Sequence, residues 1–119
     1  MIYQTPLLNP GGHYNSNTGE YTCPKTGVYM FFYSVYSVFV KRGDSYSVLS
    51  ASLYVNSARV SRVFSRNDNS GWIYITLSHT DIVACQAGQR VWVQSDESGN
   101  FIYDYTDTNV FGGVLLYTT

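Results

Sequence analysis

The sequence predicts an all-β protein, and in particular a ten-stranded jelly-roll sandwich. Turn-forming residues return about every eight to fourteen residues, as in Asn9-Pro10-Gly11-Gly12 and Gln86-Ala87-Gly88. Short apolar or alternating runs lie between these turns, and no stretch shows the periodicity of an amphipathic helix. About ten strands fit a jelly roll better than a seven-stranded immunoglobulin sandwich.

The expected strands follow this rhythm along the chain. They are Tyr3–Leu8, His13–Asn15, Glu20–Cys23, Gly27–Val40, Ser47–Val55, Ala58–Phe64, Trp72–Leu77 together with Thr80–Ala84, Val91–Gln94, Phe101–Tyr105 and Phe111–Tyr117.

The segment Gly27–Val40 is the longest expected strand, and its first half is apolar on both faces. Side chains alternate across a strand. The two sets are Tyr29, Phe31 and Tyr33 on one face, and Val28, Met30 and Phe32 on the other. Either the strand lies wholly inside one core, or a second copy of the protein covers one face. The second copy is favoured, because no amphipathic helix is found that could serve as the cover.

The last expected strand, Phe111–Tyr117, is also apolar on both faces. This pattern predicts that it is the neighbour of the long strand in one sheet that is covered on both sides. Its paired glycines, Gly112 and Gly113, indicate a place where another backbone or a large ring approaches closely.

Length and charge limit the possible functions. The 119 residues predict one domain covering residues 1–119, with a core that needs neither metal nor disulfide. Seven Lys and Arg against eight Asp and Glu give a net charge of −1, and no basic run is present. This balance argues against a nucleic-acid partner. The 12 Tyr and 6 Phe predict an aromatic core, an aromatic interface or both.

Cysteine usage and the chain start bear on the compartment. Cys23 and Cys85 have no metal-type spacing, so they are either one disulfide or two free core residues. No signal peptide precedes Tyr3, and no transmembrane segment is expected. An extracellular protein would therefore be represented here by a mature or excised domain.

The candidates for catalysis are few. His13 and His79 are isolated near turns, where exposed polar side chains are common. Asp104 and Asp107 have the spacing of turn-capping residues as much as that of an acid and base pair. We therefore expect no catalytic residue, no metal site and no enzyme activity.

Two surface features are candidates for binding. Arg59, Arg62 and Arg66 could form a fork-like receptor for carboxylates or phosphates, with Tyr103 and Tyr105 as stacking platforms. The alternative is a solvated strand face with ordinary aromatic residues at its rim.

The second feature is the tripeptide Arg42-Gly43-Asp44 in an expected tip loop. This is the cell-adhesion sequence that integrins bind. The same residues also suit a polar hairpin turn, and tripeptides recur by chance.

Several motifs together resemble the globular head of complement component 1q, the C1q domain. They are His13-Tyr14-Asn15, Thr18-Gly19-Glu20-Tyr21-Thr22-Cys23-Pro24, Gly27-Val28-Tyr29-Met30-Phe31-Phe32-Tyr33, Ser52-Leu53-Tyr54-Val55-Asn56, Gly88-Gln89-Arg90-Val91-Trp92-Val93-Gln94 and Phe111-Gly112-Gly113-Val114-Leu115-Leu116-Tyr117. The resemblance covers nearly the whole chain in the same order.

The resemblance implies a ten-stranded jelly roll like that of tumour necrosis factor, assembled as a tight homotrimer. It also implies a secreted, extracellular recognition module. From the strand faces, the residues expected at the trimer axis or in its aromatic core are Tyr29, Phe31, Tyr33, Phe111, Gly113 and Leu115.

The sequence departs from the family pattern in three places. The usual first strand, with its Ala-Phe-Ser type motif, is missing, so either it lies outside this sequence or the fold forms without it. Several relatives bind calcium near the trimer apex, but Asp68 is the one carboxylate in the corresponding stretch 65–71. Gln89 replaces the usual acid of a Gly-Asp turn.

These observations predict a non-enzymatic, lectin-like module of innate immunity. Three equivalent weak sites would bind microbial glycans, lipopolysaccharide or cell-surface proteins together. The alternatives are a matrix assembly protein that binds copies of itself and a cytokine-like receptor ligand.

Overall fold

The structure, a computed structural model, describes residues 13–40, 47–67, 72–95, 101–102 and 110–119. The strands are β1 (Tyr14–Asn15), β2 (Glu20–Thr22), β3 (Gly27–Val40), β4 (Ser47–Val55), β5 (Ala58–Asn67), β6 (Trp72–Cys85), β7 (Arg90–Ser95), β8 (Phe101–Ile102) and β9 (Phe111–Thr118). The described part of the chain contains no helix long and apolar enough to span a membrane.

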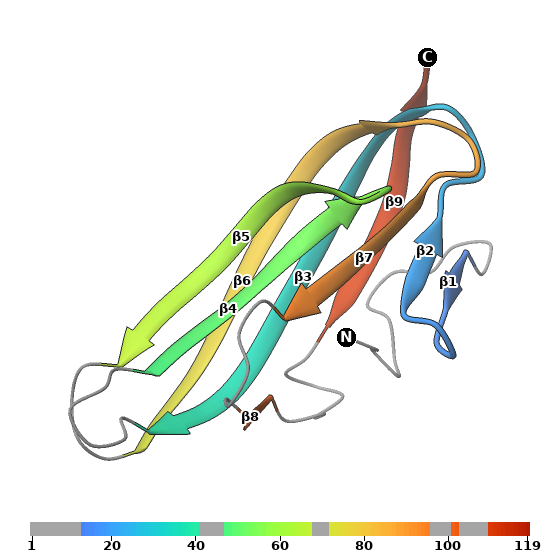
Figure 1. Cartoon of the computed structure of the whole chain (residues 1–119). Helices are drawn as coiled ribbons and strands as arrows, with labels where there is room; N and C mark the ends of the chain where they lie inside the picture. Colours follow the sequence, from blue (N-terminus) through green and yellow to red (C-terminus); the bar gives the residue numbers. More distant parts are fainter. Residues whose placement is uncertain (1–12, 41–46, 68–71, 96–100, 103–109) are drawn as a thin grey trace.

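The strands form two antiparallel sheets. One sheet has the order β1-β2-β7-β4-β5; the other has the order β6-β3-β8, with β9 also paired to β3. In Figure 1 the long strands of both sheets lie along nearly the same axis, as in an aligned sandwich. The predicted all-β jelly roll is confirmed.

The long strand β3 organises the second sheet. It pairs with β6 along its whole length, from Gly27 opposite Cys85 to Val40 opposite Trp72. On its other side it pairs with β9, as predicted for the last strand. The interruption expected between Leu77 and Thr80 is absent, because the pairing with β3 continues through those residues.

The remaining strand predictions differ from the structure mainly in length. The strand expected to end at Phe64 continues to Asn67, still paired with β4. The expected strand Tyr3–Leu8 lies outside the described residues. Only the first two residues of the expected strand Phe101–Tyr105 are described, and they form β8.

The core lies between the two sheets and is largely aromatic. Tyr21 of β2 packs edge-on against Phe31 of β3, with ring centroids 5.2 Å apart, and Phe31 stacks on Phe111 of β9. Because the Phe31 ring lies directly over Gly113, a Cβ atom at that position would collide with it. The close approach expected at the glycine pair is therefore made by this ring.

A tight turn fixes the register of β4 and β5. Asn56 and Ser57 connect the two strands with positive φ angles of 50° and 79°. Such a two-residue turn matches the twist of a hairpin. The pair Val55 and Ala58 closes the hairpin and sets the register of the residues that follow on β5.

Candidate functional site

The three arginines of β5 lie on one face of the five-stranded sheet. Arg62 is opposite Ser52 and Arg66 is opposite Val48, so both share the outward side of β4. Arg59 would point the other way in a regular strand, because it is an odd number of residues from Arg62. A register shift next to Tyr54 corrects this, and Arg59 also faces outward.

Arg62 is held in place by its neighbours. Its Nε donates a hydrogen bond of 2.7 Å to Ser50 Oγ, and its guanidinium carbon lies 5.0 Å from the centre of the Phe64 ring. Ser50 and Ser52 are fully buried although their strand side faces outward. Small hydroxyl side chains therefore form the floor of this face, and arginine and aromatic side chains cover them.

An aromatic pair continues the face toward β7. Tyr54 and Trp92 are directly opposite each other, and their rings stack with centroids 5.8 Å apart and planes 10° from parallel. The Trp92 Nε1 donates a 3.4 Å hydrogen bond to Gln94 Oε1. We call the set Arg59, Arg62, Arg66, Phe64, Tyr54 and Trp92 the arginine face.

Part of this face was predicted from the sequence. The structure brings Arg59, Arg62 and Arg66 to one side, but the expected stacking residues Tyr103 and Tyr105 lie outside the described residues. Tyr54 and Trp92 were missed. Each stands between buried or half-buried apolar residues in an alternating strand, so the alternation placed both rings on an outer face.

Two other expected sites cannot be placed. The tripeptide Arg42-Gly43-Asp44 and the calcium candidate Asp68 both lie outside the described residues. Among the residues that are described, no group of three or more His, Cys, Asp or Glu side chains could hold a metal ion.

Of the six residues expected at the trimer axis or in its aromatic core, five are buried in the core between the sheets, and one is half-buried at its margin. Tyr29, Phe31, Tyr33 and Phe111 are 0% exposed inside a single chain. They face the other sheet and form the aromatic core of the single chain. Gly113 lies against the Phe31 ring in the same core, and the half-buried Leu115 packs at its margin.

The opposite face of β3 is the open one. Ile82, Met30 and Val114 lie side by side across β6, β3 and β9. Ile82 is 67% exposed, and Met30 is only partly buried. We call the outer side of β6, β3 and β9 the apolar face.

A polar network joins the two sheets at β5 and β6. Ser61 Oγ donates a 2.5 Å hydrogen bond to Asp81 and lies 2.9 Å from the Tyr33 hydroxyl. His79 Nε2 is 3.1 Å from the other oxygen of the same carboxylate. The Asp81 carboxylate thus accepts from the serine and contacts the imidazole at the same time. The role of this network here is to link β3, β5 and β6.

Both cysteines belong to the core. Cys23 is 1% exposed and Cys85 is 3% exposed. The backbone of Cys23 hydrogen-bonds with Gly88 and Gln89, in the turn that follows Cys85. With so little exposed surface, neither sulfur is placed to act as a nucleophile toward an external substrate.

Comparisons with known proteins agree with this architecture. The sequence model of a family described as the C1q domain matches residues 1–116. Two relatives from Mus musculus are similar to this chain. Complement C1q tumor necrosis factor-related protein 2 is 31% identical to it over 114 residues, and complement C1q tumor necrosis factor-related protein 7 is 28% identical to it over 120 residues. These alignments cover 93% and 98% of this chain but 35% and 38% of the relatives. The chain thus spans less than half the length of these two relatives.

A solved structure shares the fold. The globular domain of zebrafish complement 1qA protein superposes with a TM-score of 0.62 at 19% identity, covering 98% of this chain and 88% of that one.

Proposed function

The chain belongs to the C1q domain family, and on that basis we propose that it is a secreted, non-enzymatic recognition module that binds acidic groups on microbial or cell-surface glycans. The observation that carries this proposal is the alignment of Arg59, Arg62 and Arg66 by the register shift in β5. Three guanidinium groups on one exposed sheet face suit a repeated anionic ligand.

The chemistry of the arginine face supports an acidic sugar as its ligand. A guanidinium group donates paired hydrogen bonds to a carboxylate or phosphate. The stacked rings of Tyr54 and Trp92 offer an aromatic surface for the less polar side of a sugar. Arg62 is already held by Ser50 and Phe64, so little side-chain freedom is lost when a ligand binds.

We further propose that three copies assemble through the apolar face. A 67% exposed isoleucine beside a partly buried methionine loses water contact only if a partner covers both. The arginine faces belong to the other sheet and would stay open in such a trimer. Three equivalent weak sites then bind a repetitive surface together, which raises the apparent affinity without any new contact.

The test compares two single-charge variants of the full chain on surfaces coated with lipopolysaccharide or neutral dextran. Arg62→Gln should lower binding to lipopolysaccharide about tenfold or more, because it removes a charged hydrogen-bond donor from every protomer. The matched control, Arg90→Gln, removes one charge from β7 of the same sheet. Arg90 already lies 3.5 Å from Glu20, so its loss should change binding little.

The other outcomes have definite meanings. Equal losses in both variants would indicate binding through net charge and would contradict the arginine face. Binding of the unchanged chain to neither surface, with self-association in the absence of any glycan, would favour the matrix assembly function instead.

A further inference from the structure

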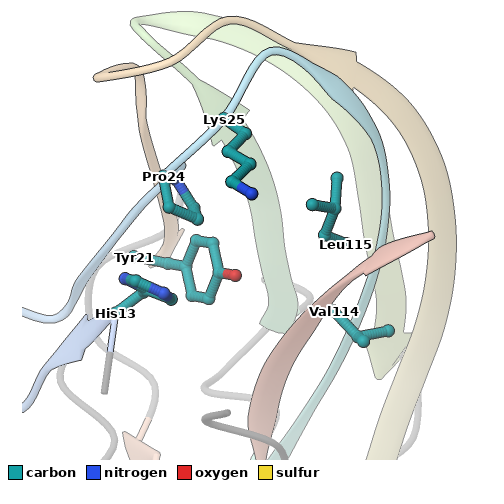
Figure 2. Close-up of a pocket in the computed structure, with 6 residues that line it drawn as sticks. All are labelled: His13, Tyr21, Pro24, Lys25, Val114 and Leu115. Carbon is teal, nitrogen blue, oxygen red and sulfur yellow. The ribbon is translucent and has the colours of Figure 1, made fainter. Parts of the chain in front are cut away.

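A cavity lies away from the arginine face, where the connection between β2 and β3 passes near β9. The volume of this cavity is about 460 Å³. Its described lining residues are His13, Tyr21, Pro24, Lys25, Val114 and Leu115. Figure 2 shows that they come from three separate parts of the chain and surround one space. The volume lies in the range of small-molecule sites.

The Tyr21 side chain leaves a polar group without a partner in this cavity. Tyr21 is 2% exposed, its ring is packed against Tyr29 and Phe31, and its hydroxyl points toward the side of the cavity formed by β9 (Figure 2). Within the described part of the chain, that hydroxyl makes no hydrogen bond. A buried hydroxyl without a partner is costly, so Tyr21 has a hydrogen bond to offer to a group that enters the cavity.

Protonation leaves Tyr21 as a hydrogen-bond donor. Burial, with a smaller contribution from the neighbouring Tyr29, raises the pKa of Tyr21 to about 12. The hydroxyl is therefore neutral at physiological pH and can donate to an oxygen acceptor of a ligand.

Lys25 supplies a positive charge over the same space. Its side chain extends from the β2–β3 connection with the terminal nitrogen directed between Tyr21 and Leu115 (Figure 2). The Tyr29 hydroxyl donates to the Lys25 carbonyl oxygen at 2.5 Å and accepts from the Lys25 N–H at 3.1 Å. The lysine backbone is thus fixed before any ligand binds.

The rest of the described lining is apolar or neutral. Strand β9 forms one side through Leu115, Pro24 forms part of the other, and none of the described lining residues is acidic. A ligand that satisfies all of these groups carries a negative charge near Lys25 and Tyr21 and an apolar body against β9.

We propose that this cavity binds a small carboxylic acid with an apolar body, with Lys25 and Tyr21 holding the carboxylate and Leu115 of β9 contacting the body. This site is separate from the arginine face and does not rest on the function proposed for it. Tyr29 is a positioning residue, because it acts by fixing the Lys25 backbone.

The experiment is a titration of the full chain, followed by backbone amide NMR, with phenylacetate, its neutral isostere phenylacetamide, and acetate. Phenylacetate should bind, and should shift the amide signals of residues 21–25 and 114–115. Phenylacetamide and acetate should each bind at least about tenfold more weakly, because one lacks the charge and the other lacks the apolar body. Phenyl phosphate tests the anion: tighter binding than phenylacetate would replace the carboxylate proposal with a phosphate one.

Two variants assign the roles of the residues. Lys25→Met keeps the length of the side chain and should weaken phenylacetate binding about tenfold or more, with no effect on phenylacetamide. Tyr21→Phe should weaken phenylacetate binding several-fold, while the stability of the free protein stays equal or rises because an unpaired buried hydroxyl is gone.

The control is Arg90→Met. Arg90 is opposite Thr22, on the other side of β2 from Tyr21, so this variant removes a nearby positive charge without touching the cavity. The proposal is overturned if phenylacetate does not bind, if phenylacetamide binds equally well, or if Lys25→Met and Arg90→Met have the same effect.

Discussion

The two outer faces of the sandwich differ in chemistry although both are built on long antiparallel strands. The apolar face on β6, β3 and β9 carries Ile82, Met30 and Val114 in one row. The arginine face on the other sheet carries three cations, an aromatic pair and a floor of buried serines. One face is suited to contact with another copy of the chain, and the other to contact with a charged ligand.

The difference shows how a small sandwich can separate two kinds of contact. Its core is shared by both sheets and is already filled by the rings of Tyr29, Phe31, Tyr33 and Phe111. Neither outer face is needed for that packing. The residues of each outer face can therefore suit a binding partner without disturbing the core. The condition is that side chains still alternate between the inner and outer faces along each strand.

The largest expected effect compares neighbouring phenylalanines on β3. Phe31 is 0% exposed in the core, whereas Phe32 is only partly buried on the apolar face. Phe31→Ala should lower the free energy of unfolding by about 3–5 kcal/mol, because it leaves a cavity among the rings. Phe32→Ala should cost clearly less, as measured by urea denaturation under conditions where the chain is monomeric. Equal losses would mean that the two faces are not distinguished by burial.

A smaller effect on folding but a large one on assembly is expected at Ile82. Ile82→Asp places a charge on the apolar face, where a second copy would have to bury it. The solution mass from light scattering should fall from about three times 13.4 kDa to the mass of one chain. Circular dichroism should stay unchanged, since Ile82 is exposed in the single chain.

Thr22→Asp, at an exposed position on β2 of the other sheet, serves as the control for that variant. It adds the same charge but lies away from the apolar face, so the trimer should persist. If both variants remain trimeric, or if the unchanged chain is a monomer, the apolar face is not the assembly surface.

The smallest expected effect concerns the turn that sets the register of the arginine face. Ser57 has a φ of 79°, a conformation that side-chain-bearing residues adopt at a cost. Ser57→Gly should raise the free energy of unfolding by about 0.5–1 kcal/mol, the relief of strain being partly offset by the entropy of glycine. Thermal denaturation measures this change, and lipopolysaccharide binding should be unaffected. A lower melting temperature would show that the turn is not strained.

The sequence predicted the strands well because burial imposes an alternating or continuously apolar pattern on them. The long strand, its pairing with the last strand and the close approach at Gly113 all came from local residue patterns. The expected break in β6 was wrong, because Ser78 and His79 are polar residues on an edge strand and the pairing with β3 holds them in line. Pairing of this kind cannot be read from one strand alone.

The candidate site was less predictable, for a different reason. Alternation by itself places Arg59 and Arg62 on opposite faces, and only the register shift opposite Leu53 and Tyr54 brings them together. A bulge depends on how two strands meet and leaves little signal in either one. Likewise, the hydroxyl of Tyr21 reaches a cavity only because the β2–β3 connection and β9 enclose a common space.

By itself, the sequence determined the all-β architecture, the succession of strands along the chain, the pairing of β9 with β3 and the presence of two apolar faces on β3. It did not determine which of those faces points inward, because alternation fixes the faces relative to each other and not relative to the core. The tertiary structure decided this by packing Phe31 against Tyr21 and Phe111, which left Met30 and Ile82 outside. Which face of β3 points into the core therefore also determines the two outer faces and the cavity. This orientation is fixed when the second sheet packs on the first.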